Sequence, residues 1–438
     1  MSKNNISTIV EECLCTACGT CKSVCPKGAI SLRENTAGFI YADMDDTKCI
    51  SCGLCRISCP SDKEHSILPE DPFHGKCIKA YLAHSCDPNI RQSSQSGGLV
   101  TALLCFLLDN NKIDGAVVNR YNPSNKRTEA FYTESREAII QSSGSKYTQS
   151  SVVPVVFDNS DKRLAAVTLG CQAESIFQLR KKSPDKIKGL QYIIGLVCIG
   201  QNSGHMTEKL ISLLNLSSEE TEAIYSFRSK DKDFGGWPGN VSIKTPNAQY
   251  TLPKNRRIEL RTIYESYRCL LCYDQMNVFS DIVCGDPWGI NHEGLKAGYT
   301  VVISRTNKGQ KLLEDAQGAG YVVLEEVSFQ SVFKGQTVDD RQVKKVRNSK
   351  IICDSNNWLY PYPECSAFNM SSSAEVDKAI RDRLNFTRTY YKSSKEEEIL
   401  LSKERYKKVI IDRRKKNVIN FFKKVFRKGK SVLTIFNK

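Results

Sequence analysis

Eight cysteines near the N-terminus are the residues best suited to chemistry, because they form a repeat with an offset of 34 residues. Each half reads C-x2-C-x2-C-x3-C-P. The halves are Cys15, Cys18, Cys21, Cys25 and Pro26, then Cys49, Cys52, Cys55, Cys59 and Pro60. Three thiolates on one tight loop can bind three irons of a 4Fe–4S cubane, while the fourth reaches the other cluster. The spacing therefore predicts two 4Fe–4S clusters with crossed ligands.

The crossed pattern assigns a ligand set to each cluster. The sets are Cys15, Cys18, Cys21 and Cys59 for one cluster, and Cys49, Cys52, Cys55 and Cys25 for the other. A structural zinc site built from C-x2-C pairs is the alternative. Residues from about 13 to 62 resemble the two-cluster ferredoxin family. That resemblance implies an α+β, ferredoxin-like module that transfers single electrons.

Four further cysteines predict a third site in the body of the chain. Predicted strands over 164–169 and 193–197 are each followed by a cysteine, and ligands collect at the carboxyl ends of strands in open α/β sheets. A later C-x2-C pair supplies two more thiols. The set is Cys171, Cys198, Cys269 and Cys272. The alternative for Cys171 and Cys198 is a buried, small apolar residue.

A glycine turn before a helix is the best candidate for binding phosphate. Residues 99–108 are continuously apolar and predict a buried helix, which a strand over 115–118 follows. Ser96, Gly97 and Gly98 precede this helix, and Thr101 lies in its first turn. Backbone N–H groups and the helix dipole can hold phosphate at such an end. A plain helix cap explains the pattern equally well.

The body resembles the coenzyme F(420) hydrogenase/dehydrogenase beta-subunit family from about residue 77 to residue 343. The shared motifs are Gln95-Ser96-Gly97-Gly98 with Thr101, Gly144 to Tyr147, Gly170-Cys171-Gln172, Gly195 to Cys198, Gly236 to Gly239, Arg268-Cys269 to Cys272, and Asp281-Ile282 with Gly285-Asp286. The resemblance implies an α/β domain that binds FAD and a 4Fe–4S cluster. Some similar proteins are encoded among bacterial polysaccharide-synthesis enzymes.

Carried over to this chain, the resemblance gives roles to individual residues. The third cluster would be held by Cys171, Cys198, Cys269 and Cys272, the flavin phosphate by Ser96, Gly97, Gly98 and Thr101, and the flavin region would include Lys146 and Tyr147. Two positions depart from the family's pattern. Leu169-Gly170 replaces the usual Thr-Pro, which could loosen the loop near the flavin. Cys284 replaces a small polar residue and could compete as a cluster ligand.

These features together predict an iron–sulfur flavoprotein oxidoreductase. Electrons would pass from a ferredoxin-type donor through the 4Fe–4S clusters to FAD, which converts single electrons into pairs. The acceptor would be organic, either a deazaflavin coenzyme or a polysaccharide-pathway substrate, and the direction could reverse. One alternative is an electron-transfer subunit that has no substrate and serves a partner enzyme. The other is a zinc-binding, membrane-associated scaffold.

No proton donor is assigned from the sequence. His205 is the histidine nearest a predicted site, but position alone favours a structural role. Asp286 could hold a ribose hydroxyl or cap the following turn.

Composition and charge divide the 438 residues into five segments. We expect the cluster module over 1–65, a polar linker over 66–76 and the flavin-binding domain over 77–345, then an extension over 346–400 and a basic tail over 401–438. The tail holds 14 Lys and Arg against 2 Asp and Glu, so the remaining 400 residues carry only +3 of the net +15. The body is therefore close to neutral.

The tail combines its cations with apolar residues at helical spacing, which are Val418, Phe422, Val425 and Phe426. A basic amphipathic helix of this kind suits an anionic membrane surface. The alternatives are a disordered tail or a helix docked on the body.

Other features of the sequence limit location and partners. No apolar stretch reaches the roughly 18 residues of a membrane span, and the first residues lack a signal-peptide core. We therefore expect a cytoplasmic protein that is at most peripheral at the inner face of the membrane. No recognised motif for nucleic acid accompanies the charge. The expected partners are a redox donor or acceptor protein and a small-molecule or lipid-linked substrate.

Overall fold

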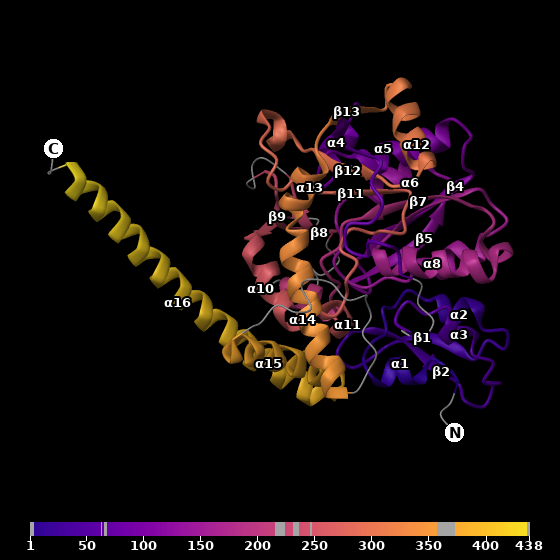
Figure 1. The fold of residues 1–438 in the computed structure, drawn as a ribbon, viewed down its shortest axis with the longest axis horizontal. Coiled ribbons are helices and arrows are strands. Elements are labelled where there is room, and N and C mark those ends of the chain that lie inside the picture. Colours follow the sequence, from indigo (N-terminus) through magenta and orange to yellow (C-terminus); the bar gives the residue numbers. More distant parts are fainter. Residues whose placement is uncertain are drawn as a thin grey trace.

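The computed structural model describes residues 4–62, 64, 68–214, 224–230, 236–245, 248–356 and 373–435, and side chains at the C-terminal end only as far as residue 415. A cysteine-rich module, an α/β body and a group of C-terminal helices follow one another along the chain (Figure 1). The module lies against the lower end of the body in this view.

The module is a small α+β unit that holds both cysteine loops. Its elements are α1 (Ser7–Glu11), α2 (Thr20–Val24), β1 (Ile30–Glu34), β2 (Ile40–Met44) and α3 (Leu54–Ile57). The two strands pair antiparallel, with Ile30 opposite Met44. Each cysteine loop leads directly into one of the short helices α2 and α3.

The body is built on an eight-stranded mixed sheet in the order β13-β3-β12-β11-β7-β6-β4-β5. The strands are β3 (Lys79–Ser85), β4 (Gly115–Asn122), β5 (Arg127–Thr133), β6 (Leu164–Thr168), β7 (Leu190–Leu196), β11 (Ile282–Gly285), β12 (Thr300–Ser304) and β13 (Val322–Glu326). Strands β11, β7, β6 and β4 are parallel, and the flanking strands are antiparallel. The carboxyl ends of these four strands therefore share one edge.

Helices cover both faces of this sheet, as expected for parallel strands that are buried on both sides. They are α4 (Pro88–Ser93), α5 (Leu99–Asp109), α6 (Arg136–Gln141), α7 (Val152–Asp158), α8 (Gly170–Lys182) and α12 (Asn307–Gly318), with 3-10 turns at Pro184–Ile187 and Glu293–Ala297. The expected buried helix is confirmed as α5, which packs on one face with α12. Helices α7 and α8 pack on the other face.

A smaller antiparallel sheet in the order β10-β9-β8 lies beside the body. This region contains α9 (His205–Ser212), β8 (Ile224–Ser229), β9 (Asn240–Lys244), β10 (Gln249–Leu252), α10 (Lys254–Tyr264) and α11 (Tyr267–Leu270). Its apolar residues share one core with the module and with the C-terminal helices. Phe39 of the module, for example, stacks on Tyr391 with ring centroids 5.1 Å apart.

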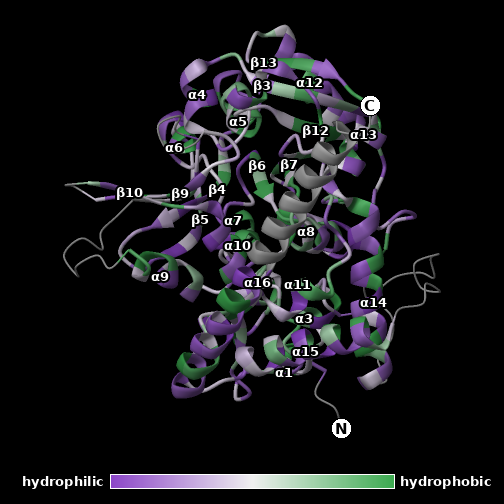
Figure 2. Ribbon diagram, turned by 90° about the vertical axis from the view of Figure 1, so that its left-hand side faces the viewer, coloured by the Kyte–Doolittle hydropathy of each residue, from purple (hydrophilic) through white to green (hydrophobic). Residues whose placement is uncertain are grey.

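After β13, the described residues form four helices, α13 (Phe329–Gln336), α14 (Val338–Asn356), α15 (Ala374–Tyr391) and α16 (Lys395–Ile435). The expected boundaries at 345/346 and 400/401 both fall inside helices, α14 and α16. The far end of α16 projects away from the body (Figure 1), while strand β6 lies near the centre of the fold (Figure 2). The tail side chains Val418, Phe422, Val425 and Phe426 lie outside the described part. No described helix is long and apolar enough to cross a membrane.

Candidate functional site

The four cysteines of one crossed set line a single pocket at the surface of the module. Cys25 comes from the first half of the repeat, and Cys49, Cys52 and Cys55 come from the second. Cys52 is exposed, and Cys25 and Cys49 are half-buried. The neighbouring Ile50 is 57 % exposed. We call these four cysteines the outer set.

The other crossed set consists of Cys15, Cys18, Cys21 and Cys59, and we call it the inner set. All four residues are buried. Burial is the main cause that raises the pKa of Cys21 and of Cys59, and other thiols of the set raise it further. Beyond the effect of burial, Cys15 and Cys18 raise the pKa of both Cys21 and Cys59, as expected for neighbouring thiols. A bound metal would take the place of their protons.

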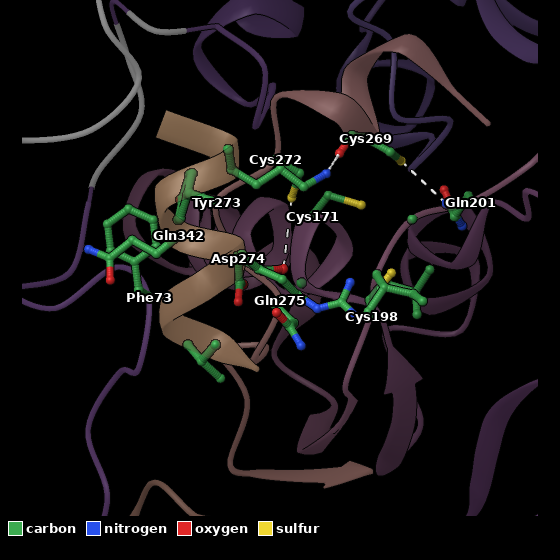
Figure 3. Close-up of a pocket in the computed structure, with 17 residues that line it drawn as sticks. Phe73, Cys171, Cys198, Gln201, Cys269, Cys272, Tyr273, Asp274, Gln275 and Gln342 are labelled. Atoms are coloured by element: carbon green, nitrogen blue, oxygen red, sulfur yellow. Dashed lines mark hydrogen bonds between the residues drawn. The ribbon is translucent and has the colours of Figure 1, made fainter. Parts of the chain in front are cut away.

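All four cysteines predicted for the third site line one pocket at the carboxyl edge of the large sheet (Figure 3). Cys171 lies at the start of α8, directly after β6, and Cys198 follows the parallel neighbour β7. Cys269 lies in α11, and Cys272 follows it. Because β6 and β7 are adjacent and parallel, the cysteines after them meet at one edge. We call these four cysteines the third set.

The third set and the inner set are close neighbours. Burial raises the pKa of Cys198 to about 12, and Cys269 and Cys272 raise it further. Burial also raises the pKa of Cys171, to which Cys272 and then Cys18 add. Hydrogen bonds join the two regions through residues 150–153 of the body: Val153 N–H donates to the Cys18 carbonyl at 3.3 Å, and Gln172, next to Cys171, donates to the Ser150 carbonyl at 3.0 Å. The two sets therefore lie on either side of the junction between module and body.

The donor chemistry of the three sets fits 4Fe–4S clusters. Among the described residues, no three or more His, Cys, Asp or Glu are arranged to hold one metal ion. A 4Fe–4S cubane does not need ligands that converge on one ion, because each of its four thiolates binds a separate iron. Backbone N–H groups also point at sulfurs of every set, for example at 3.4 Å from Ala17 to Cys15, from Ser51 to Cys49, and from Gln201 to Cys269. Such hydrogen bonds help to set cluster potentials.

Both departures from the family pattern have a structural explanation. Cys284 does not line the third pocket; it lies in β11 within the apolar core, and burial raises its pKa to about 12. Gly170 does not give the loose loop that the sequence suggested. A Cβ atom there would lie 2.5 Å from Oδ2 of Asp274, so glycine allows close packing beneath Cys171.

Several cationic residues around the third pocket were not predicted. Arg268 is 3 % exposed, Lys345 donates to the carbonyl oxygen of Cys269, and Arg341 lines the pocket. Phe73 lines it too, although it lies in the segment expected to be a linker. Arg268 could have been noticed because it precedes Cys269 in the motif. Lys345 and Arg341 lie on α14, and no motif points to them.

The glycine turn before α5 is closely packed. Gly98 is the N-cap residue with φ of +77°, and no side chain caps the helix. A Cβ atom on Gly97 would lie 2.5 Å from the carbonyl oxygen of Ala83, and its N–H donates to Thr300 at 2.9 Å. Thr101 is buried in the first turn. Only glycine fits at this turn, whose helix N–H groups lack a side-chain cap.

Ser96 and Tyr147 are joined through two residues that sequence reasoning did not combine. Ser96 donates to one carboxylate oxygen of Asp286, after β11, and Arg228 on β8 donates to the other at 2.5 Å. Arg228 also donates to the Tyr147 hydroxyl at 3.3 Å. Its Nη2 atom and the Trp237 indole N–H have no hydrogen-bond partner within the described part of the chain.

Lys146 and His205 point elsewhere. The ammonium group of Lys146 donates to carbonyl oxygens of its own loop, those of Ser143 at 2.8 Å and Gly144 at 3.1 Å, and burial lowers its pKa to about 7. His205 lies 3.5 Å from Glu398 of α16, in keeping with the structural role expected for it.

Two short connections run from the third pocket to this Ser96–Asp286–Arg228–Tyr147 network. Gln201 donates to Cys269, and the next residue, Asn202, donates to the Tyr147 carbonyl at 2.9 Å. On the other side, Gln275 of the pocket donates to Gln336 at 2.8 Å, and Gln336 donates to the Asp286 carbonyl at 2.6 Å. The third set and the network are therefore adjacent sites.

Comparison with known proteins first defines the class. Residues 14–63 match the 4Fe-4S dicluster domain, so the chain is an iron–sulfur protein with a dicluster module. Residues 80–156 match the N-terminal model, and residues 161–329 the C-terminal model, of the coenzyme F(420) hydrogenase/dehydrogenase beta subunit. The chain belongs to this family, as the sequence motifs predicted.

Curated relatives are moderately similar. The F(420)-dependent formate dehydrogenase subunit beta of Methanocaldococcus jannaschii is 25 % identical, over 61 % of this chain and 67 % of its own length. The coenzyme F(420) hydrogenase subunit beta of Methanothermobacter thermautotrophicus is 27 % identical, over 54 % and 80 %. The match to the coenzyme F(420)-dependent sulfite reductase of M. jannaschii is 24 % identical and covers 74 % of this chain but only 49 % of that protein.

A solved structure shares the fold. A chain of the F(420)-reducing NiFe hydrogenase complex from Methanosarcina barkeri superimposes with a TM-score of 0.52 at 20 % identity. The match covers 68 % of this chain and all of the other. The ferredoxin-like module followed by an α/β domain is thus the architecture expected from the sequence.

Proposed function

We propose that this chain is an iron–sulfur, flavin-dependent oxidoreductase. It takes electrons from a ferredoxin-type donor and delivers them to an organic acceptor, either a deazaflavin coenzyme or a polysaccharide-pathway substrate, and the direction is reversible. The observation that carries the proposal is the series of adjacent sites: the outer set, the inner set, the third set and the Ser96–Tyr147 network. The names of the relatives, which include F(420)-dependent enzymes, support the deazaflavin acceptor.

The residues of the network fit a flavin dinucleotide. Ser96, Gly97, Gly98 and Thr101 would hold its phosphates at the N-terminus of α5, where the helix N–H groups lack a side-chain cap. Arg228 has an N–H group still unpaired among the described residues and would donate it to the bound group. FAD, when bound there, supplies conversion between single electrons and hydride.

Tyr147 closes one side of this site. The Cζ atom of Arg257 lies 4.3 Å from the centroid of the Tyr147 ring, and the Phe227 ring meets it edge to face with centroids 5.5 Å apart. These contacts fix the ring, and the Arg228 hydrogen bond fixes the hydroxyl. Lys146 donates hydrogen bonds to the carbonyl oxygens of Ser143 and Gly144, which stabilises the loop before Tyr147 and keeps Tyr147 in place.

The proposal includes partners and location. A redox protein would meet the module at the outer set, where Cys52 and Ile50 are exposed. The substrate is a small or lipid-linked molecule. We place the protein in the cytoplasm, with residues 401–438 on an anionic membrane surface, because this segment carries +12 and the far end of α16 projects away from the body (Figure 1). Vesicles with and without anionic lipid, mixed with the full chain, test this part.

The first experiment is to measure iron, sulfide and flavin in anaerobically purified protein. We expect about twelve irons and one FAD, which corresponds to three cubanes and one flavin. About eight irons without flavin would overturn the flavoenzyme and favour an electron-transfer subunit that serves a partner enzyme. Zinc without iron would favour a membrane-associated scaffold and would refute the proposal altogether.

A further inference from the structure

The first cysteine loop, residues 15–21, carries three cysteines of the inner set and is seated on the body. The Ser151 hydroxyl donates to the carbonyl oxygen of Ala17 at 2.6 Å, and Val153 N–H donates to that of Cys18 at 3.3 Å. Gly19 lies against Pro154 so closely that a Cβ atom would be 2.5 Å from the proline ring. The N-terminal turn of α7 therefore covers this loop, and this contact holds the inner set toward the third set.

A single buried arginine spans the gap between the two sets. Arg268 immediately precedes Cys269 of the third set, and its Nε donates to the Ser61 hydroxyl at 2.9 Å. Ser61 in turn donates its N–H to Cys59 Sγ of the inner set at 3.4 Å and its hydroxyl to the Leu14 carbonyl at 2.7 Å. Arg268 is thus bonded to the module on one side and joined by the chain to the third set on the other.

The charge of Arg268 acts on two cysteines of the third set. Cys272, Glu174, Cys171 and Tyr273 are the groups that interact with it most strongly, and Glu174, which is 2 % exposed, opposes its charge. A guanidinium stays charged at all pH values of interest, and its planar fork aims several N–H groups in fixed directions, which the single ammonium group of lysine does not do. A fixed positive charge beside a cluster favours the reduced, more negative form.

We propose that the inner set is the immediate electron partner of the third set, and that Arg268 is the positioning residue that holds this junction and makes reduction at the third set easier. The proposal rests on the proposed function, since it requires clusters on both sets. One electron crosses the junction, so the inner side is oxidised and the third side is reduced, without any bond broken or proton moved. The ferredoxin-type donor supplies that electron through the outer set.

The test uses the full chain with its clusters, purified without oxygen. Arg268→Met removes the charge and the fork, whereas Arg268→Lys keeps the charge. Two quantities are measured by electron paramagnetic resonance: the midpoint potential of the third cluster, and the magnetic coupling between it and its nearest reduced neighbour. Arg127→Gln is the matched control, because Arg127 also ties body to module, through Glu34 of β1 at 2.5 Å, and none of its hydrogen bonds within the described part of the chain reaches a residue of a cysteine loop.

We expect Arg268→Met to make reduction of the third cluster about tenfold less favourable, which is about 59 mV for one electron. We expect Arg268→Lys to keep the potential but to weaken the magnetic coupling, and Arg127→Gln to leave the potential unchanged. An unchanged potential and coupling in Arg268→Met, or an equal shift in Arg127→Gln, would overturn the proposal.

Two further observations keep the outcome clear. Should Arg268→Met fail to fold, Ser61→Ala tests the same junction without stranding Glu174, and a coupling identical to wild type would then refute the role of this bond. Magnetic coupling of the third cluster to the outer set instead of the inner set would refute the order of the sites. Wild-type protein with only about eight irons would refute the proposed function itself, before Arg268 is tested.

Discussion

The two halves of the cysteine repeat have the same local backbone but different surroundings. Ala17 and Ser51 occupy equivalent left-handed positions, with φ of 60° and 53°, and each donates its N–H to the cysteine two residues earlier. Gly19 and Gly53 are equivalent N-caps of α2 and α3, with φ of 85° and 75°. Yet Gly19 meets Pro154 of the body, and Gly53 meets only the side chain of Asn4.

This difference shows that the motif determines what each loop can bind, whereas docking determines which site it serves. The repeat supplies two cysteine loops of nearly identical backbone. Helix α7 of the body covers the loop of the inner set, whereas the outer set stays at the surface, with Cys52 and Ile50 exposed. A symmetrical unit thereby becomes directional, with one side for an external protein and one side for the third set.

The largest expected effect concerns the third set, which lies next to the inner set. We expect Cys171→Ala to remove about four irons of about twelve, because one ligand set loses a thiolate. Cys284→Ala is the control, since Cys284 lies in the apolar core outside the pocket. Iron and sulfide analysis of anaerobic protein checks both variants. Loss of four irons in Cys284→Ala but not in Cys171→Ala would show that the third ligand set is wrongly chosen.

A matched pair of glycine substitutions tests the comparison directly. Gly19→Ala and Gly53→Ala both place a side chain at positive φ, which costs about 1–2 kcal/mol. Gly19→Ala also forces a Cβ atom against the Pro154 ring, whereas the amide of Asn4 can move away from Gly53→Ala. We therefore expect Gly19→Ala to lower stability by about 1–3 kcal/mol more.

Thermal loss of iron–sulfur absorbance in the two variants measures this difference. Protease accessibility of the junction between module and body provides a second readout, which should increase only in Gly19→Ala. Equal losses of stability in the two variants would mean that docking does not distinguish the halves.

Much of the site was predictable because its ligands are close in sequence. The crossed sets follow from spacing within 45 residues, and the structure gathers Cys25 with Cys49, Cys52 and Cys55 in one pocket. The third set was harder, because its four cysteines meet only through the adjacency of β6 and β7 and the position of α11. The strand ends and the C-x2-C pair suggested this set, and the family resemblance supported their convergence.

What could not be predicted depends on contacts between distant residues. Arg268 bonds Ser61 across 207 positions, and Arg228 reaches Asp286 across 58. Both contacts depend on how separate units pack: Arg268 of α11 meets the module, and Arg228 of the smaller sheet meets Asp286 after a strand of the large sheet. One sequence does not reveal such packing. Phe73, in the segment expected to be a linker, is buried and lines the third pocket, and no motif in the sequence pointed to that contact.

Electron transfer from the inner set to the third set serves an oxidoreductase only if the third set passes the electrons to a second cofactor, the flavin. We expect Arg228→Met combined with Asp286→Asn to weaken flavin binding about tenfold to a hundredfold, because a hydrogen bond to a charged group contributes about 1.5–3 kcal/mol. Changing both partners avoids a stranded buried carboxylate. Fluorescence titration of FAD into flavin-stripped protein measures the affinity.

The matched control is Arg163→Met combined with Asp114→Asn. This pair, joined at 2.5 Å, is a salt bridge beside the opposite, amino-terminal ends of β6 and β4. Its loss should leave FAD affinity unchanged. A network variant that binds FAD as tightly as wild type would separate Arg228 from the flavin and return the network to a structural role.

The smallest expected effect concerns a second contact that seats the module. Gly204 N–H donates to the Gly38 carbonyl at 2.9 Å, and Gly38 lies against the His205 ring, which pairs with Glu398. Burial opposes the charged form of His205, but the Glu398 hydrogen bond and the charge of Glu208 outweigh burial and raise its pKa. Burial likewise opposes the charged form of Glu398, and the His205 and Tyr390 hydrogen bonds outweigh it and lower that pKa.

The directions of the two pKa shifts define the pH range in which the His205–Glu398 pair stabilises the fold. The raised pKa of His205 contributes stability that is complete below its ordinary value of 6.5 and is lost as pH rises through the folded value. The lowered pKa of Glu398 contributes above 4.5 and is lost on acidification. A double-mutant cycle with His205→Gln and Glu398→Gln should therefore give a coupling of about 0.5–1 kcal/mol near pH 6 that disappears near pH 8.5. Urea midpoints of the four proteins measure it, and a coupling independent of pH would show that the contact is one of packing alone.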